Sequence, residues 1–204
     1  MFITIRSLIH IGCLSPLLWL GYILYYGDIS QVFGADPIKE LIHFLGLTAL
    51  YIFSALFVLR IITQLNGQAK LRSLHRDLGL WGLFWLCLHL TSYLLFELAL
   101  DYRLFLSEII KRPYLIIGAI AFLLFLSVAI SSMPYLRRKM AKNWFVLHQF
   151  SNLAILLAII HYYWSVKSVT LQPLLFMLFA ALLLLWKLFS KRIMAFRQKL
   201  AKNK

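Results

Sequence analysis

Acidic residues, and charged residues in general, are scarce in this 204-residue sequence. Only 14% of the residues are charged, with 7 Asp and Glu against 21 Lys and Arg, whereas 62% are hydrophobic. A soluble domain is about 25% charged and roughly 45 to 50% apolar. The chain has too little polar surface for a water-soluble globule, so we expect an integral membrane protein.

Several catalytic and metal-binding motifs are also missing. Cys13 and Cys87 are far apart and lack metal-site spacing, so we interpret them as small apolar packing residues. The chain contains no glycine-rich phosphate loop, no serine nucleophile elbow and no HExxH motif. Acidic residues are also absent from the long hydrophobic runs, which disfavours a carboxylate proton relay or a cation transporter built on one.

Six long runs contain no Asp, Glu, Lys or Arg and hold 19 to 24 residues each: 7–27, 41–59, 78–96, 113–136, 143–166 and 168–186. About 20 apolar residues cross a hydrocarbon core of about 30 Å as a helix, whereas barrel strands are shorter and alternate. The sequence therefore predicts an all-α, six-transmembrane-helix bundle as a single domain over 1–186. A basic tail, 187–204, follows it. The first run is too long and too aromatic for a signal peptide, so we expect it to be retained.

The charges divide unevenly between the two ends of this bundle. The segments on the side of both termini carry 16 basic residues and one acidic residue, whereas the other side carries 5 basic and 6 acidic residues. Short cytoplasmic loops collect Lys and Arg, so both termini are predicted to be cytoplasmic. The net charge of +14 is thus explained by topology rather than by a nucleic-acid partner.

Histidine is the remaining ionisable residue type near the membrane interior, and all six lie in or beside a run: His10, His43, His75, His89, His148 and His161. Two helices carry a pair each, with spacings of 14 residues from His75 to His89 and 13 from His148 to His161. Both spacings correspond to roughly 20 Å along a helix, and both helices cross in the same direction. The two outer histidines can therefore face each other, and so can the two inner ones. Facing imidazoles serve as axial ligands of haem iron, so the pairs predict two stacked haems that carry electrons across the membrane.

The rotation around the two helices differs. Two side chains 14 residues apart point within about 40° of each other around a helix, but two side chains 13 residues apart point about 140° away from each other. We therefore expect the fifth helix to bend, bulge or begin irregularly near His148. The alternative, in which a histidine simply packs or hydrogen-bonds between helices, is strongest for His75 at the charged boundary.

Several stretches, in this order, resemble the MsrQ family, also called YedZ, of the ferric-reductase-like transmembrane superfamily: LIHIGCLSPLLWL, GADPIKELIHFLG, LGLW, LHLTSY, RPYLIIG, LHQF and HYYWSVK. The resemblance implies a haem b-containing electron carrier in the bacterial inner membrane. Its donor would be the quinone pool or a cytoplasmic flavin reductase. Its acceptor would be a periplasmic, molybdopterin-containing subunit that reduces protein methionine sulfoxide.

The resemblance also implies roles for individual residues. Family ligand positions carry over to His89, His148 and His161, with His89 and His161 as one haem pair. His75 departs from the best-known members, which have Arg there, but eukaryotic ferric reductases and NADPH oxidases have His. This difference implies a more complete second haem site, so the chain holds one or two haems. FMN is also assigned to the family, but no sequence pocket places it here.

Other polar residues are weaker candidates. The basic side chains that could contact haem propionates are Arg72, Arg76, Arg112 and Lys167. His10, near the inner surface, is a candidate quinone or propionate contact, with an interfacial hydrogen bond as the alternative. His43, near Asp36 and Glu40, is a candidate docking-face residue, with helix packing as the alternative.

Two rival functions remain open. The first is a ferric-reductase-like cytochrome with another acceptor, such as ferric iron or oxygen. It would need a separate partner, because the chain ends eighteen residues after Trp186 without an NADPH- and FAD-binding domain. The second is a haem-free membrane anchor or small transporter in which the histidines only pack.

Overall fold

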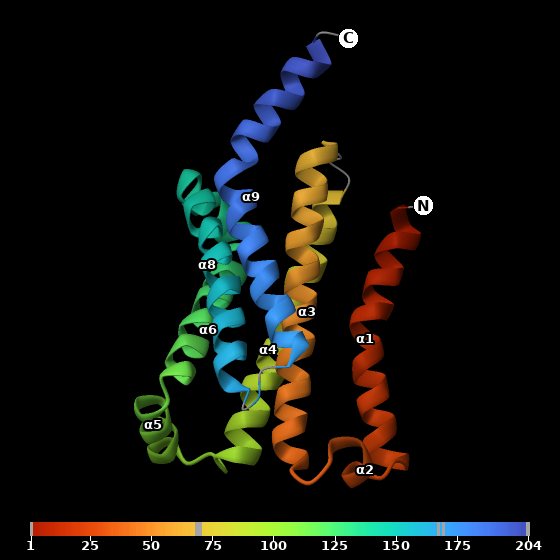
Figure 1. Ribbon diagram of the computed structural model, residues 1–204, viewed down its shortest axis with the longest axis vertical. Coiled ribbons are helices and arrows are strands. Elements are labelled where there is room, and N and C mark those ends of the chain that lie inside the picture. Colours follow the sequence, from red (N-terminus) through yellow and green to blue (C-terminus); the bar gives the residue numbers. More distant parts are fainter. Residues whose placement is uncertain (1, 68–70, 167, 169, 203–204) are drawn as a thin grey trace.

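The computed structural model describes residues 2–67, 71–166, 168 and 170–202, and the regular secondary structure of these residues is entirely helical (Figure 1). The helices in chain order are α1 (Phe2–Tyr26), α2 (Ile29–Phe33), α3 (Pro37–Asn66), α4 (Arg72–Ser92), the π-helical turn η2 (Tyr93–Glu97), α5 (Tyr102–Lys111), α6 (Pro113–Ser131), α7 (Pro134–Met140), α8 (Lys142–Ser165) and α9 (Leu171–Lys202).

Six of these helices are long and apolar enough to cross a membrane: Ile3–Tyr26, Pro37–Asn66, Ser73–Glu97, Pro113–Ser131, Lys142–Ser165 and Leu171–Ser190. The prediction of an all-helical, six-span protein is confirmed. Both ends of the chain lie at the same end of the bundle, and the short helices α2 and α5 lie at the opposite end (Figure 1).

Two helix boundaries differ from the hydrophobic runs. The run 113–136 contains two helices, because α6 ends at Ser131 and a new helix, α7, begins at Pro134. Proline favours the first turn of a helix, where its missing N–H costs nothing. The basic segment from 187 continues α9 to Lys202. It contains no Gly or Pro that would end the helix.

Acidic residues at the end of the bundle opposite the termini start three helices. Asp28 caps α2 through the Ser30 amide, Asp36 caps α3, and Asp101 caps α5. Hydrogen bonds from the Ser30 hydroxyl and amide hold the pKa of Asp28 below its usual range. Much of the negative charge at this end therefore fixes loop and helix geometry.

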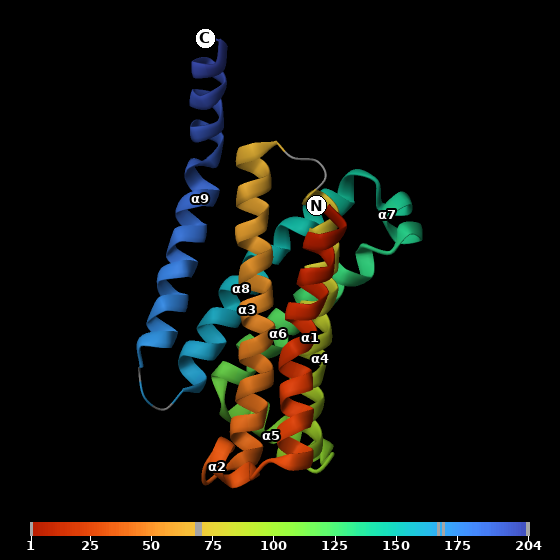
Figure 2. The same ribbon diagram turned by 90° about the vertical axis from the view of Figure 1, so that its right-hand side faces the viewer.

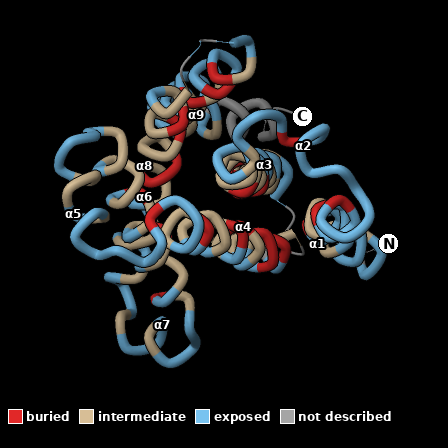
Figure 3. Tube along the Cα trace, turned by 90° about the horizontal axis from the view of Figure 1, so that it is seen from below, coloured by how far each residue is buried: buried red, intermediate tan, exposed pale blue. Residues whose placement is uncertain are grey.

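The bundle is built around two helical hairpins. Helix α3 packs on α4, and α6 packs on α8, while α9 lies along α8 and α1 lies beside α4 (Figures 2 and 3). One buried cluster joins the two hairpins to α9 and includes Phe53, Phe125 and Phe176. The interior is therefore the space between the hairpins.

Helix α1 is joined to α4 by polar contacts. Arg6 donates two hydrogen bonds to the buried Asp77, with N–O distances of 2.7 and 3.0 Å. Deeper in the bundle, the Trp85 indole N–H donates to the Cys13 carbonyl oxygen at 3.0 Å. Asp77 therefore lies within the third span, just outside the uncharged run, and an arginine compensates it.

Candidate functional site

Two histidines from different hairpins meet in the interior. His89 on α4 and His161 on α8 have ring centres 6.5 Å apart. Among the histidines that the sequence singled out, this is the outer pair. The structure therefore brings His89 and His161 together as the spacing predicts.

A backbone carbonyl holds each of these rings. The Nδ1 atom of His89 lies 2.8 Å from the Ile42 carbonyl oxygen, and Nδ1 of His161 lies 2.7 Å from the Tyr114 carbonyl oxygen. Because a carbonyl oxygen only accepts, each Nδ1 carries the proton and each Nε2 keeps a free lone pair. This is the tautomer that a metal-ligating histidine uses.

A glycine makes room for each ring. A Cβ atom on Gly46 would lie 2.8 Å from Nδ1 of His89, and one on Gly118 would lie 2.7 Å from Nδ1 of His161. In an α-helix the carbonyl of residue i lies beside residue i+4, so each glycine lies next to the carbonyl that holds the ring. A side chain at either position would push the imidazole off its acceptor.

These features repeat along the chain with an offset of 72 residues, in four pairs: Ile42 and Tyr114, Gly46 and Gly118, Phe53 and Phe125, and His89 and His161. The two phenyl rings stack face to face at the centre of the bundle, 3.9 Å apart with an interplanar angle of 9°. The hairpins α3–α4 and α6–α8 therefore contribute matching halves to one site.

The spacing of the histidines does not predict the two carbonyls, the two glycines or the phenyl pair. The signal was nevertheless present, because residues 42–53 (IHFLGLTALYIF) and 114–125 (YLIIGAIAFLLF) share Gly, Ala and Phe at matching positions. A comparison of the chain with itself would have found it.

The pair fits a metal held between two imidazoles. A metal about 2.0 Å from each nitrogen, with each nitrogen roughly 1.2 Å from its ring centre, separates the two centres by about 6.4 Å. The observed separation is 6.5 Å. The described residues contain no group of three or more His, Cys, Asp or Glu side chains that could hold a metal ion. Two ligands are too few for a structural zinc site but are the number that haem iron takes from its protein.

Comparisons with known proteins agree with this site. Residues 45–159 match the family described as ferric reductase like transmembrane component. A protein-methionine-sulfoxide reductase heme-binding subunit MsrQ from Pasteurella multocida is 48% identical over 190 residues, which cover 92% of each chain. The MsrQ proteins of Pectobacterium carotovorum and Cronobacter sakazakii are 41% and 40% identical over 184 residues, or 90% of each chain. The chain belongs to the MsrQ family.

The inner histidines of this MsrQ family member differ from the outer pair. The Nε2 atom of His148 lies 3.2 Å from the Ser132 hydroxyl, and its ring lies 3.8 Å from the Trp144 ring. His75 is partly buried near the start of α4. The pairing of His75 with His148 stays a prediction.

The irregularity expected near His148 lies at the start of α8, where Ala141 has a φ of +47°, and no bulge interrupts the helix at His148 itself. Helix α8 is a continuous α-helix from Lys142 to Ser165, so His148 and His161 point about 140° apart. A second departure from α-helical geometry lies in the third span, at η2, after His89. The regular helix thus directs the His148 side chain toward Ser132 and Trp144, which it contacts.

The basic candidates for propionate contacts lie in different surroundings. Arg112 forms an ion pair with Glu108 at 2.6 Å and donates a hydrogen bond to the Tyr114 hydroxyl at 3.3 Å. That hydroxyl and Glu108 raise the pKa of Arg112. Arg76 is exposed on α4, whereas the side chain of Arg72 and residue Lys167 lie outside the described residues. All four assignments stay predictions.

His10 and His43 lie at opposite ends of the bundle. His10 accepts a hydrogen bond at Nδ1 from the Trp81 indole at 2.8 Å, and its Nε2 lies 3.9 Å from Asp77. The ring of His43 lies 5.6 Å from that of Tyr162. His10 therefore takes part in the contacts between α1 and α4, and a quinone or docking role for either histidine stays a prediction.

Proposed function

We propose that this MsrQ family member holds a b-type haem between His89 and His161 and carries electrons across the bacterial inner membrane. The matched imidazoles support this proposal, because each Nδ1 proton is held by a carbonyl and each Nε2 is free. When bound, haem iron supplies one-electron oxidation and reduction. The protein holds and orients the ligands, and the apolar helices exclude water.

The second part of the proposal is an inner haem ligated by His75 and His148, which would give the chain two haems. Both residues lie in the half of the bundle that contains the chain termini. Ligation by His148 through Nε2 requires its contact with the Ser132 hydroxyl, now 3.2 Å, to open. FMN also belongs to the proposal as a cofactor without an assigned site.

The direction of electron flow follows from the topology that we propose. The strong excess of Lys and Arg at the end with the termini supports a cytoplasmic location for that end. Electrons would enter there from quinol or from a cytoplasmic flavin reductase. They would leave at the opposite end to a periplasmic, molybdopterin-containing methionine sulfoxide reductase. The substrate chemistry would take place on that partner.

Haem spectra of the purified protein test the cofactor. We expect a Soret band in the wild type, the loss of one of the two haems in His89→Ala and in His161→Ala, and an unchanged band in His10→Ala. His148→Ala should lower the haem-to-protein ratio from two to one. A wild type without a Soret band, even after reconstitution with haem, would rule out the electron-transfer proposal. An unchanged ratio in His148→Ala would rule out the inner site.

The donor and acceptor need a separate experiment in vesicles. Reduced quinone or a flavin reductase with its reductant is added at the cytoplasmic face, and haem reduction is followed by absorbance. Oxidised partner is then added at the opposite face, where it should reoxidise the haem. Haem that neither donor reduces would exclude this electron path while leaving the cofactor assignment intact.

A further inference from the structure

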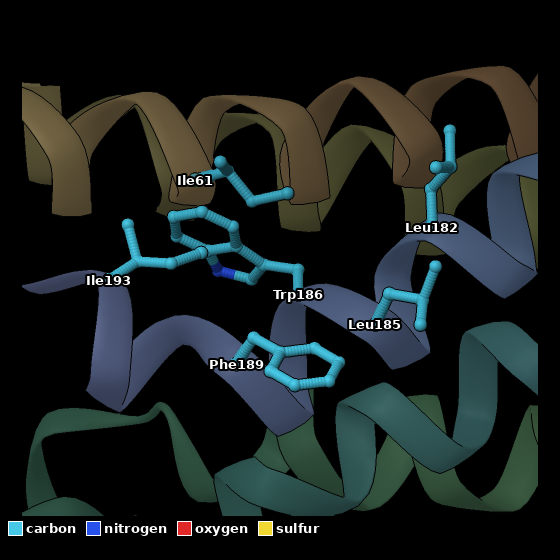
Figure 4. A pocket seen from close by; sticks show the side chains of 6 residues that line it. All are labelled: Ile61, Leu182, Leu185, Trp186, Phe189 and Ile193. Atoms are coloured by element: carbon cyan, nitrogen blue, oxygen red, sulfur yellow. The ribbon is translucent and has the colours of Figure 1, made fainter.

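An apolar groove runs between α3 and α9 in the half of the bundle that contains the termini. Its volume is about 570 Å³, and it is lined by Ile61 from α3 and by Leu182, Leu185, Trp186, Phe189 and Ile193 from α9 (Figure 4). The lining side chains of α9 are partly or well exposed, and Leu182 and Leu185 are 54% and 49% accessible. No described part of the chain fills the groove.

The groove exists because α9 is anchored in two places. Near the start of α9, Gln172 donates to the Tyr51 hydroxyl at 2.7 Å, and Phe176 and Ala180 join the buried core. Further along, the Trp186 indole donates to the Gln64 side-chain oxygen at 3.0 Å. From Leu182 onward, large apolar side chains line open space between the two helices.

The length and depth of the groove match one leaflet of a bilayer. Leu182 and Ile193 are separated by about 16 Å along the helix, and one leaflet of the hydrocarbon core is about 15 Å thick. With the middle of the span Leu171–Ser190 taken as the bilayer midplane, Leu182 lies about 2 Å from it. The groove therefore matches one extended acyl chain in length and in depth.

Polar groups stand where the head group of such a lipid would lie. Arg192 would be about 17 Å from the midplane, just beyond the hydrocarbon core. It is exposed and lies seven residues after Leu185, so it projects within about 20° of the same helix face. Within the described residues, no ion pair occupies its guanidinium.

Gln64 contributes a second group with a defined orientation. The indole N–H of Trp186 only donates, so the side-chain oxygen of Gln64 must face Trp186. The amide NH2 of Gln64 then points away from the indole, and this side chain is exposed. A guanidinium and an amide donor at this level suit a phosphate and the ester oxygens next to it.

We propose that the groove binds one anionic glycerophospholipid of the leaflet on the side of the termini. One acyl chain lies against Leu185 and Phe189, and the phosphate lies at Arg192. Anionic head groups bind basic sites at this side of membrane proteins. The bound lipid fills the space between α3 and α9 and so holds the second half of α9 against the bundle.

Native mass spectrometry of the purified protein tests this proposal, with phosphatidylglycerol and phosphatidylcholine of identical acyl chains as probes. We expect one phosphatidylglycerol to be retained per chain, about fivefold more tightly than phosphatidylcholine, because a basic residue near the membrane surface contributes about 1 kcal/mol. Arg192→Gln should abolish this preference. Lys187→Gln removes the same charge from the opposite face of α9 and should preserve it.

A second pair of variants tests the groove itself. Leu185→Trp fills the groove and should remove the retained lipid, whereas Leu188→Trp adds the same side chain at a position that is 72% exposed and outside the groove. Thermal unfolding of both variants shows that they are folded. The proposal would be overturned if the two lipids bound equally or if the two variants within either pair had equal effects. It would also be overturned if the protein retained a neutral isoprenoid in place of phosphatidylglycerol.

Discussion

Gly118 provides a sharp test of the histidine site, because a single methyl group added there meets the ring of His161. The new Cβ atom would lie 2.7 Å from Nδ1, 2.8 Å from Cε1 and 3.1 Å from Cγ of that ring. Ordinary contacts between carbon atoms are about 3.5 to 4.0 Å, so the ring must shift by roughly 0.8 Å or more. The 2.7 Å hydrogen bond to the Tyr114 carbonyl opposes this shift.

Overpacking of this kind costs about 1 to 3 kcal/mol. If this free energy is lost from haem binding, Gly118→Ala should weaken haem affinity by about 5- to 150-fold. Gly46→Ala should act similarly, because its Cβ would lie 2.8 Å from Nδ1 of His89. The assay is haem titration of the apoprotein followed at the Soret band, with electron paramagnetic resonance of the oxidised haem to report ligand orientation.

Gly79→Ala is the matched control. Gly79 is on the same helix as His89, and a Cβ there would meet nothing within 4 Å. Alanine in place of glycine in a helix is favourable by about 1 kcal/mol, so the control should be at least as stable as the wild type. If Gly118→Ala and Gly79→Ala bind haem equally tightly, the glycines do not determine the positions of the imidazole rings, and the proposed haem site between His89 and His161 is wrong.

Three further changes have expected outcomes. Arg6→Gln leaves the buried Asp77 without its charged partner and should lower the free energy of unfolding by about 1 to 3 kcal/mol, measured by thermal melting. Arg6→Lys should recover part of that loss, and no recovery would mean that charge plays no role. Phe53→Ala removes one of the two stacked phenyl rings and should lower the free energy of unfolding by about 3 to 5 kcal/mol. An unchanged melting temperature would contradict the packed core. Asp36→Ala removes the cap of α3 and should cost about 0.5 to 2 kcal/mol, whereas Asp36→Asn should cost much less.

The helical architecture was predictable because the bilayer imposes a simple constraint on composition. Runs of about 20 residues without charge are difficult to place anywhere but in a spanning helix. Their ends were less predictable, since a hydrophobic run does not reveal where a proline restarts a helix. Thus α6 ends at Ser131 and Pro134 begins α7, although the sequence between them is as uncharged as the helix.

The meeting of His89 and His161 was also predictable, because the two helices carry their histidine pairs at nearly the same spacing, so that a single shift of one helix brings both pairs level. The groups that orient the rings were harder to foresee. A backbone carbonyl carries no residue identity, and a glycine in a membrane helix has many uses. Only the packing of α3 on α4, and of α6 on α8, shows that Gly46 and Gly118 face an imidazole.

The regular geometry of α8 constrains the inner half of the proposed electron path. The spacing of 14 residues leaves His75 and His89 about 40° apart on α4, whereas the spacing of 13 leaves His148 and His161 about 140° apart on α8. One rigid shift of a helix can bring both histidine pairs to matching depths in the membrane. It cannot also turn both histidines of α8 toward α4. His148 and His161 therefore face different sides of α8, and His148 would have to leave Ser132 to ligate an inner haem.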